Sequence, residues 1–209
     1  MDTFSLIAAE RLRLADELQD LADDDWDRPS LCGEWTNGEV LAHLDVPFTM
    51  GVVGFLTGIV KAAGSFDRAN ARFAIDLADR TDPDACIEIL RANAAHRFTP
   101  PGFGPEAPLT DVIVHGIDIL QPLGRSVAVA PEALAVSLPF LLTRKAGRGF
   151  GAVRSDDLRL EPDDLDLPLG EGDHLVQGPA LAMAGALAGR AACVAQLQGP
   201  GADLLRVRA

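Results

Sequence analysis

The spacing of apolar residues changes once along the chain, near residue 150, and this change constrains the fold more than any other feature. Before it, leucines and isoleucines recur at helical spacing; after Gly149-Phe150-Gly151, leucines alternate with polar residues. A period near 3.6 residues predicts amphipathic helices, and a period of two predicts half-buried strands. We therefore expect a mainly α chain of class α+β, with a helical domain over residues 1–148 and a small α/β domain over residues 149–209.

The first domain is predicted to be an up-down helical bundle, because long helices are joined by modest loops. Its helices are expected at residues 3–22, from Thr36 onward, 83–97, 109–121 and 131–145. Thr36 and Glu39 have the spacing of a capping box. Pro47 should kink or end that helix, because it clashes with the carbonyl of His43. The apolar run from Phe48 to Val60 is too short to cross a bilayer and predicts a buried helix.

The second domain is predicted from alternating leucines and turn residues. Strands are expected at Leu158–Leu160, at Leu165–Leu169 and at His174–Gln177. An alanine-rich helix should begin at Pro179 and end at Gly189, because proline favours the first turn and glycine the C-terminal end. A last strand is expected at Leu204–Val207.

The charge of the chain limits its partners. The 209 residues carry a formal net charge of −13, and 48% of them are apolar, which indicates a globular protein with a sizeable core. The excess of acidic residues argues against a nucleic-acid or anionic membrane surface. An anionic substrate would then require a local cation. The first residues lack the apolar stretch of a secretion signal, so we expect a cytoplasmic protein. The sequence does not distinguish a monomer from a homodimer.

Three cysteines, Cys32, Cys86 and Cys193, are scattered along the chain. An odd number of distant cysteines is typical neither of a disulfide framework nor of a zinc-thiolate site. We expect reduced thiols, as in other cytoplasmic proteins.

The strongest chemical signal is a set of three polar residues, His43, Asp111 and His115. Asp111 and His115 are four residues apart in a predicted helix, so they share one face of it. If the helix that carries His43 packs against that face, two imidazoles and one carboxylate converge. Such a set is a standard open site for a divalent transition metal, with a position left for water or substrate.

Each of these residues also has a purely structural interpretation. A single histidine on an apolar helix face, such as His43, is more often a hydrogen-bonded core residue than a ligand. An acid near a helix start, such as Asp111, is favoured by the helix dipole alone. Asp118 is either a surface acid or an acceptor for an imidazole N–H, and Cys32 can be a small buried hydrophobe. The metal hypothesis therefore depends on the set taken together.

Three segments resemble a known family. The segment LCGEWTNGEVLAHL (residues 31–44) is similar to a Cys-x-Gly-Trp-Thr-x-x-x-Val-x-x-His-Leu signature, and PLTDVIVHGIDILQPLG (108–124) is similar to a helix with an acid, a histidine and Gly-x-Asp. The tail, residues 176–208, resembles a small C-terminal domain. Together they resemble the mycothiol-dependent maleylpyruvate isomerase family, within the DinB/YfiT-like metal-dependent thiol transferases.

This resemblance implies a DinB-like up-down four-helix bundle and assigns roles to several residues. The family's metal ligands correspond to His43, Asp111 and His115, and an arginine of its C-terminal domain that binds substrate corresponds to Arg190. The implied cofactors are a divalent metal, zinc ahead of nickel, and mycothiol or a similar thiol. The implied partners are that thiol and a small electrophilic, anionic substrate, which is isomerised or receives the thiol.

The sequence departs from the family at one ligand. The family acid is commonly Glu, whereas Asp111 is one methylene shorter, so a contact through water is the alternative to direct binding. Two other functions stay open: a metal-dependent hydrolase on the same scaffold, and a catalytically silent binding protein that has lost strong metal binding. Neither the substrate nor any residue that carries out catalysis follows from the sequence.

Overall fold

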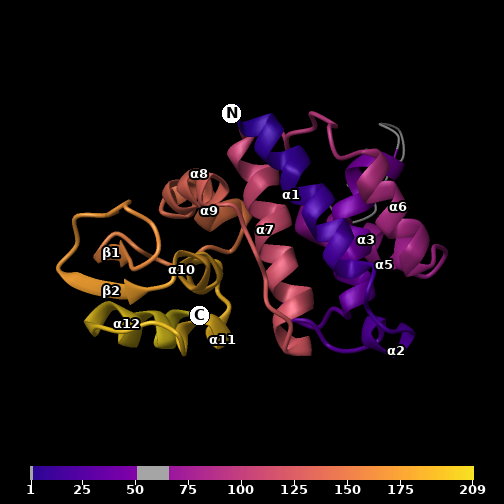
Figure 1. Cartoon of the computed structure of the whole chain (residues 1–209). Helices are drawn as coiled ribbons and strands as arrows, with labels where there is room; N and C mark the ends of the chain where they lie inside the picture. The colour runs from indigo at the N-terminus through magenta and orange to yellow at the C-terminus, as the bar shows by residue number, and fades with distance from the viewer. Residues whose placement is uncertain (1, 51–65) are drawn as a thin grey trace. The chain divides into compact units, whose positions relative to one another are not determined.

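The computed structural model describes residues 2–50 and 66–209, which are mainly helical with a two-stranded sheet (Figure 1). The elements are α1 (Thr3–Leu18), α2 (Asp23–Trp26), α3 (Asn37–Thr49), α5 (Phe66–Ala78), α6 (Pro83–Ala92), α7 (Glu106–Leu120), the 3-10 turn η1 (Gln121–Leu123), α8 (Pro131–Leu141), α9 (Arg144–Gly149), β1 (Leu158–Pro162), β2 (His174–Gly178), α10 (Ala180–Leu187), α11 (Ala191–Val194) and α12 (Pro200–Arg208). The predicted mainly helical α+β composition is confirmed. Among the described residues, no helix is long and apolar enough to cross a membrane.

The helices predicted in the first 150 residues are confirmed in their main part, with shorter bounds. The helix predicted over 131–145 is divided into α8 and α9, and the Thr143 side chain caps α9 by accepting from the Ala146 N–H. Helix α5 was not predicted. Ala69, Phe73 and Leu77 recur at four-residue spacing on one face, so the sequence carries a helical signal here that the prediction did not use.

The start of α3 has the predicted capping box. The Thr36 hydroxyl accepts from the Glu39 backbone N–H at 3.2 Å, and the Glu39 carboxylate accepts from the Thr36 backbone N–H at 2.8 Å. The helix continues through Pro47 and ends at Thr49. Most of the buried helix predicted over residues 48–60 lies outside the described residues.

The chain divides into two compact units, one of which comprises Ile7–Phe98 and His115–Val127. In this unit α3 packs against both α5 and α6. Gly116 of α7 faces Leu14 of α1, where an added Cβ would lie 3.4 Å from a leucine methyl group. This distance is an ordinary van der Waals contact, so α7 packs directly on α1 here. The predicted domain boundary after residue 148 stays a prediction.

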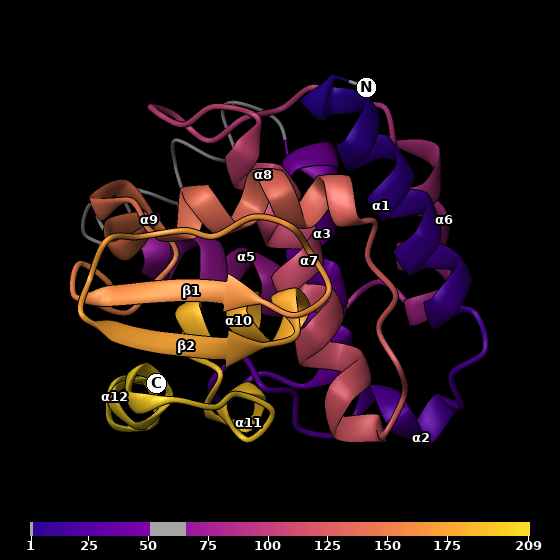
Figure 2. The same cartoon turned by 60° about the vertical axis from the view of Figure 1, so that its left-hand side comes forward.

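The other unit includes Thr99–Val114 and Ala128–Ala209. Here β1 and β2 are parallel, with the register running from Leu158 opposite His174 to Pro162 opposite Gly178 (Figure 2). Leu158 and Leu160 are buried, as their alternation predicts. Helix α10 packs on β1 and α12 packs on β2. Of the strand predicted over residues 165–169, only Leu169 bonds to β1, as an isolated antiparallel bridge with Leu160.

The prediction of a final strand over residues 204–207 is wrong, because these residues lie in α12. Pro200 occupies the first turn, Asp203 lies near the N-terminus, and Arg206 and Arg208 lie in the last turn. These charges match the helix dipole, and proline suits a helix start. Gly199, with φ of 94°, makes the preceding turn.

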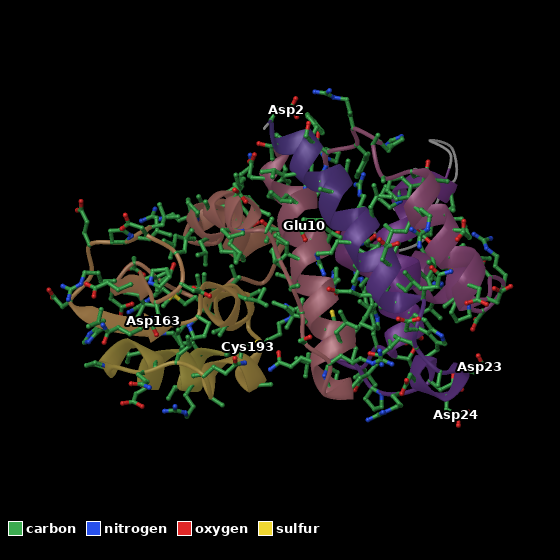
Figure 3. The ribbon with its side chains drawn as sticks, in the orientation of Figure 1. Asp2, Glu10, Asp23, Asp24, Asp163 and Cys193 are labelled. Atoms are coloured by element: carbon green, nitrogen blue, oxygen red, sulfur yellow. The ribbon has the colours of Figure 1, made fainter. Side chains whose placement is uncertain are left out.

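Acidic side chains are distributed over several elements (Figure 3). Asp23 and Asp24 begin α2, and Asp163 follows β1. Glu10 on α1 is almost fully buried and forms an ion pair with Arg13 at 2.6 Å.

Candidate metal centre

The loop before α3 brings side chains to the C-terminal half of α7. The Ser30 hydroxyl donates to the Trp35 carbonyl at 2.8 Å and accepts from the Cys32 N–H at 3.0 Å, which fixes the turn. The Leu31 N–H donates to the Asp118 carbonyl at 3.1 Å. These bonds hold Cys32 and Trp35 beside the helix that carries His115.

His43 lies within α3, where its half-buried ring is near Trp35, Asn70 and His115. The Trp35 ring centroid is 5.3 Å from that of His43, and the His115 ring centroid is 4.7 Å away with the planes inclined by 75°. The Asn70 amide nitrogen of α5 lies 3.2 Å from His43 Nδ1. Neighbours from two other helices and the preceding loop therefore fix the position of this imidazole.

His115 is held by an acid of its own helix. Its Nδ1 lies 2.8 Å from Oδ2 of Asp118, three residues further along α7, and Asp118 is fully buried. A carboxylate accepts a hydrogen bond from Nδ1–H and leaves Nε2 of the same ring for another partner. This is the usual arrangement behind a metal-binding histidine.

The structure brings His43, Asp111 and His115 together, with one ligand atom of each lying within 4.8 Å of the others. Asp111 and His115 are one turn apart on α7, as their spacing predicts. Two neutral imidazoles and one carboxylate are a donor set that divalent zinc, nickel, cobalt or iron accepts. The residues fit such an ion, and metal binding by them stays a prediction.

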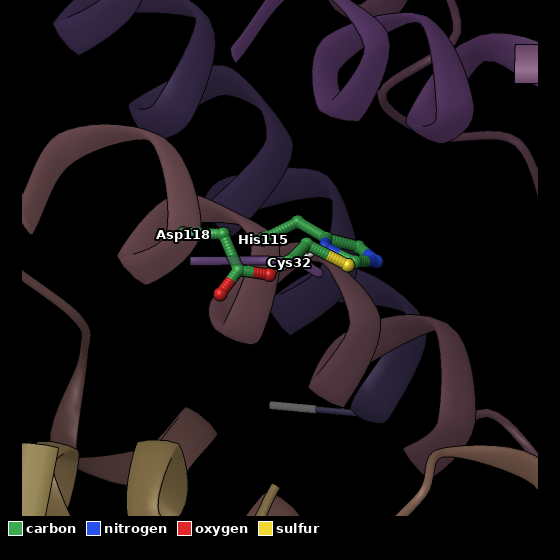
Figure 4. Close-up of side chains that lie close together, drawn as sticks. All are labelled: Cys32, His115 and Asp118. Carbon is green, nitrogen blue, oxygen red and sulfur yellow. Dashed lines mark hydrogen bonds and ion pairs between the residues drawn. The ribbon is translucent and has the colours of Figure 1, made fainter. Parts of the chain in front are cut away.

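A second group, Cys32, His115 and Asp118, has ligand atoms equally close together (Figure 4). Metal binding by this group through His115 Nδ1 or Asp118 Oδ2 would break the 2.8 Å hydrogen bond between these two residues. That bond is between buried partners, where an unpaired carboxylate is unfavourable. We therefore interpret Asp118 as an orienting residue and Cys32 as a free thiol beside the site.

Arg190, the predicted substrate-binding residue, is half-buried at the start of α11. Its guanidinium donates to the carbonyl of Ala188, and its backbone N–H donates to the Gly185 carbonyl at 2.9 Å. The predicted helix end at Gly189 is confirmed, since this residue has φ of 86° and follows α10 directly. The substrate-binding role of Arg190 stays a prediction.

Two buried titratable groups, Asp45 of α3 and Cys86 of α6, lie together; Cys86 is one of the three predicted reduced thiols, whereas Asp45 was not singled out from the sequence. Burial raises the pKa of Asp45 to about 8, while the Cys86 thiol and the positive charge of Arg11 partly oppose this shift. Burial and the neighbouring Asp45 raise the pKa of Cys86 to about 12. Cys86 is therefore a protonated thiol at neutral pH and a poor nucleophile.

Asn70 is the site residue that sequence reasoning missed. It lies on α5, which was itself not predicted, at a half-buried position of the face that packs against α3. Only the packing of α5 against α3 brings its amide to His43.

Comparisons with known proteins agree with the predicted resemblance. Residues 7–108 match the family model of the mycothiol maleylpyruvate isomerase N-terminal domain. This range includes His43 and ends just before Asp111 and His115. No curated protein matches the chain.

Two solved structures have a similar fold. One is a crystal structure of a histidine-to-alanine mutant of the mycothiol-dependent maleylpyruvate isomerase, with a TM-score of 0.59 and 14% identity over 96% of this chain and 92% of that one. The other is a crystal structure of the mycothiol-dependent maleylpyruvate isomerase, with a TM-score of 0.54 and 16% identity over 90% of this chain and 88% of that one. At these identities the likeness establishes the fold.

Proposed function

We propose that this chain, whose residues 7–108 belong to the mycothiol maleylpyruvate isomerase N-terminal domain family, is a divalent-metal-dependent enzyme that uses a low-molecular-weight thiol. The thiol is mycothiol or a close analogue, and the substrate is a small electrophile that is isomerised or receives the thiol. The observation that carries the proposal is the convergence of His43, Asp111 and His115 within 4.8 Å of one another. In this proposal the helical part of the chain is the DinB-like four-helix bundle.

The metal would be held by His43 and His115 through imidazole nitrogens and by Asp111 through a carboxylate oxygen. When bound, a divalent ion lowers the pKa of a thiol or water that binds it and so supplies a nucleophile at neutral pH. Zinc is the expected ion and nickel the alternative, because both accept two nitrogens and one oxygen.

The protein residues have separate tasks in this proposal. Asp118 accepts a hydrogen bond from Nδ1–H of His115, so that Nε2 of the same ring can bind the metal. The Trp35 ring packs beside the His43 ring, with centroids 5.3 Å apart, and helps to hold it in place. Arg190 is proposed to bind an anionic group of the substrate through its planar guanidinium.

The test is a reaction of the zinc-loaded chain with a low-molecular-weight thiol and maleylpyruvate or a maleyl compound. We expect thiol-dependent isomerisation or thiol consumption that disappears when the metal is removed by a chelator and returns when zinc is added. Metal-dependent turnover without thiol would instead support the hydrolase. Absence of bound metal in protein prepared without a metal-affinity tag would support the silent binding protein.

A further inference from the structure

The amide of Asn70 is in contact with one of the two histidines that the proposed function requires. Asn70 Nδ2 lies 3.2 Å from His43 Nδ1, and the side chain is half-buried between α5 and α3. This contact resembles the one between Asp118 and His115, where the carboxylate oxygen lies 2.8 Å from Nδ1. Both imidazoles therefore have a polar partner at Nδ1.

The proton on His43 decides whether the ring can bind a metal. If Nδ1 accepts from the amide, the proton of the neutral ring is on Nε2, which then has no lone pair for an ion. If the amide is turned by 180°, Oδ1 takes the place of Nδ2 and accepts from Nδ1–H, which leaves the Nε2 lone pair available. The two ends of an asparagine amide have the same shape, so the same packing accommodates both arrangements.

We propose that Asn70 is a positioning residue that accepts a hydrogen bond from His43 Nδ1–H through Oδ1 and so directs Nε2 toward the metal. The inference rests on the proposed function, because that function requires Nε2 of His43 as a ligand. It assigns α5, a helix that supplies none of the expected ligands, a direct part in the site. Asp118 has the same task for His115, with a charged acceptor in place of a neutral one.

The difference between the Asp118 carboxylate and the Asn70 amide predicts how Asn70→Asp should affect metal binding. A carboxylate can only accept, so it permits the Nδ1–H tautomer alone, whereas an amide permits both tautomers. Asn70→Asp keeps the size of the side chain and removes the competing tautomer. It should therefore retain or tighten metal binding, whereas a residue whose task is to donate to Nδ1 would lose that hydrogen bond in this variant.

The experiment measures zinc and cobalt affinity of the purified chain by competition with a chromophoric chelator. Variants are Asn70→Ala, Asn70→Asp and, as a matched control, Asn93→Ala, whose amide donates to the Ile89 carbonyl of its own helix at 2.8 Å. We expect Asn70→Ala to weaken metal binding by about 10- to 100-fold, as is usual for a residue that orients a ligand. Asn70→Asp should bind at least as tightly as the wild type, and Asn93→Ala should match it.

Imidazole nitrogen NMR of the metal-free protein tests the tautomer without any metal. We expect Nδ1–H on His43 in the wild type and in Asn70→Asp, and its loss in Asn70→Ala. The inference would be overturned by any of three results. These are unchanged metal affinity in Asn70→Ala, an affinity of Asn70→Asp as low as that of Asn70→Ala, and a proton on Nε2 of His43 in the wild type. A wild type that binds no metal but has an Asn70-dependent Nδ1–H would instead contradict the proposed function alone.

Discussion

Nδ1 of His115 lies 2.8 Å from Oδ2 of Asp118, one turn further along α7, and both side chains are buried. If this carboxylate orients the imidazole, Asp118→Ala should lower metal affinity by about 10- to 100-fold, and Asp118→Asn should lower it less because its Oδ1 can still accept. Competition with a chromophoric chelator gives both affinities. Circular dichroism should confirm that each variant is folded, and equal affinities in Asp118→Ala and wild type would exclude the orienting role.

The three proposed ligands should differ in importance. His43→Ala and His115→Ala should each abolish bound metal, because each removes an imidazole donor, whereas Asp111→Ala should weaken retention by a smaller factor because its short carboxylate can act through water. Elemental analysis of protein purified without a metal-affinity tag measures the metal content. Equal metal in the wild type and in the double histidine variant would show that the site is elsewhere.

Thiol-dependent turnover should not require the protein's cysteines. Cys86 has a pKa raised to about 12, which leaves it protonated at neutral pH, and Cys193 is buried. A Cys32→Ser, Cys86→Ala, Cys193→Ala variant that is folded and zinc-loaded should therefore consume thiol at close to the wild-type rate. If that variant is inactive and Cys32→Ser alone reproduces the loss, the thiol beside His115 would be the nucleophile.

Arg190 can be tested by comparing two substitutions. Loss of a bidentate carboxylate contact typically costs about 1.5–3 kcal/mol, or roughly ten- to a hundredfold in affinity. Arg190→Lys should weaken binding of an anionic substrate analogue nearly as much as Arg190→Ala, because an ammonium cannot reproduce the planar fork. Isothermal calorimetry measures the binding. An Arg190→Lys variant with wild-type affinity would exclude the substrate-binding role and leave a structural one, to which the bond to the Ala188 carbonyl contributes.

Stability should depend on pH through Asp45. Its pKa is about 8 in the folded protein and 3.8 as a free side chain, so the folded state keeps a proton that the unfolded state loses between these values. The free energy of unfolding should therefore fall as pH rises from about 4 to about 8, by up to about 1.4 kcal/mol per pH unit. Asp45→Asn cannot titrate and should lack this slope in urea unfolding measured with a chelator present. If the free energy of unfolding changes equally with pH in both proteins, Asp45 is ionised in the folded state over this pH range.

Local sequence signals determined much of the helical part. The capping box of Thr36 and Glu39 defines the start of α3 through bonds between residues three apart, and the spacing of Asp111 and His115 places both on one face of α7. Such features depend on neighbours along the chain, so the sequence is sufficient to predict them. The family resemblance also came from short segments of this kind.

Tertiary packing decided the contacts between distant segments at the candidate site and the structure of the C-terminal tail. The contact of Asn70 with His43 exists only because α5 packs against α3, and residue spacing carries no signal for a pair that is 27 positions apart. The tail Leu204–Val207 has the residues of a strand, yet it is helical because Pro200 starts a helix that packs on β2. The sequence by itself determined which residues can form helices and which proposed metal ligands share a helix face. The tertiary structure alone decided which neighbours orient those ligands, because side chains from distant segments meet only when the core is packed.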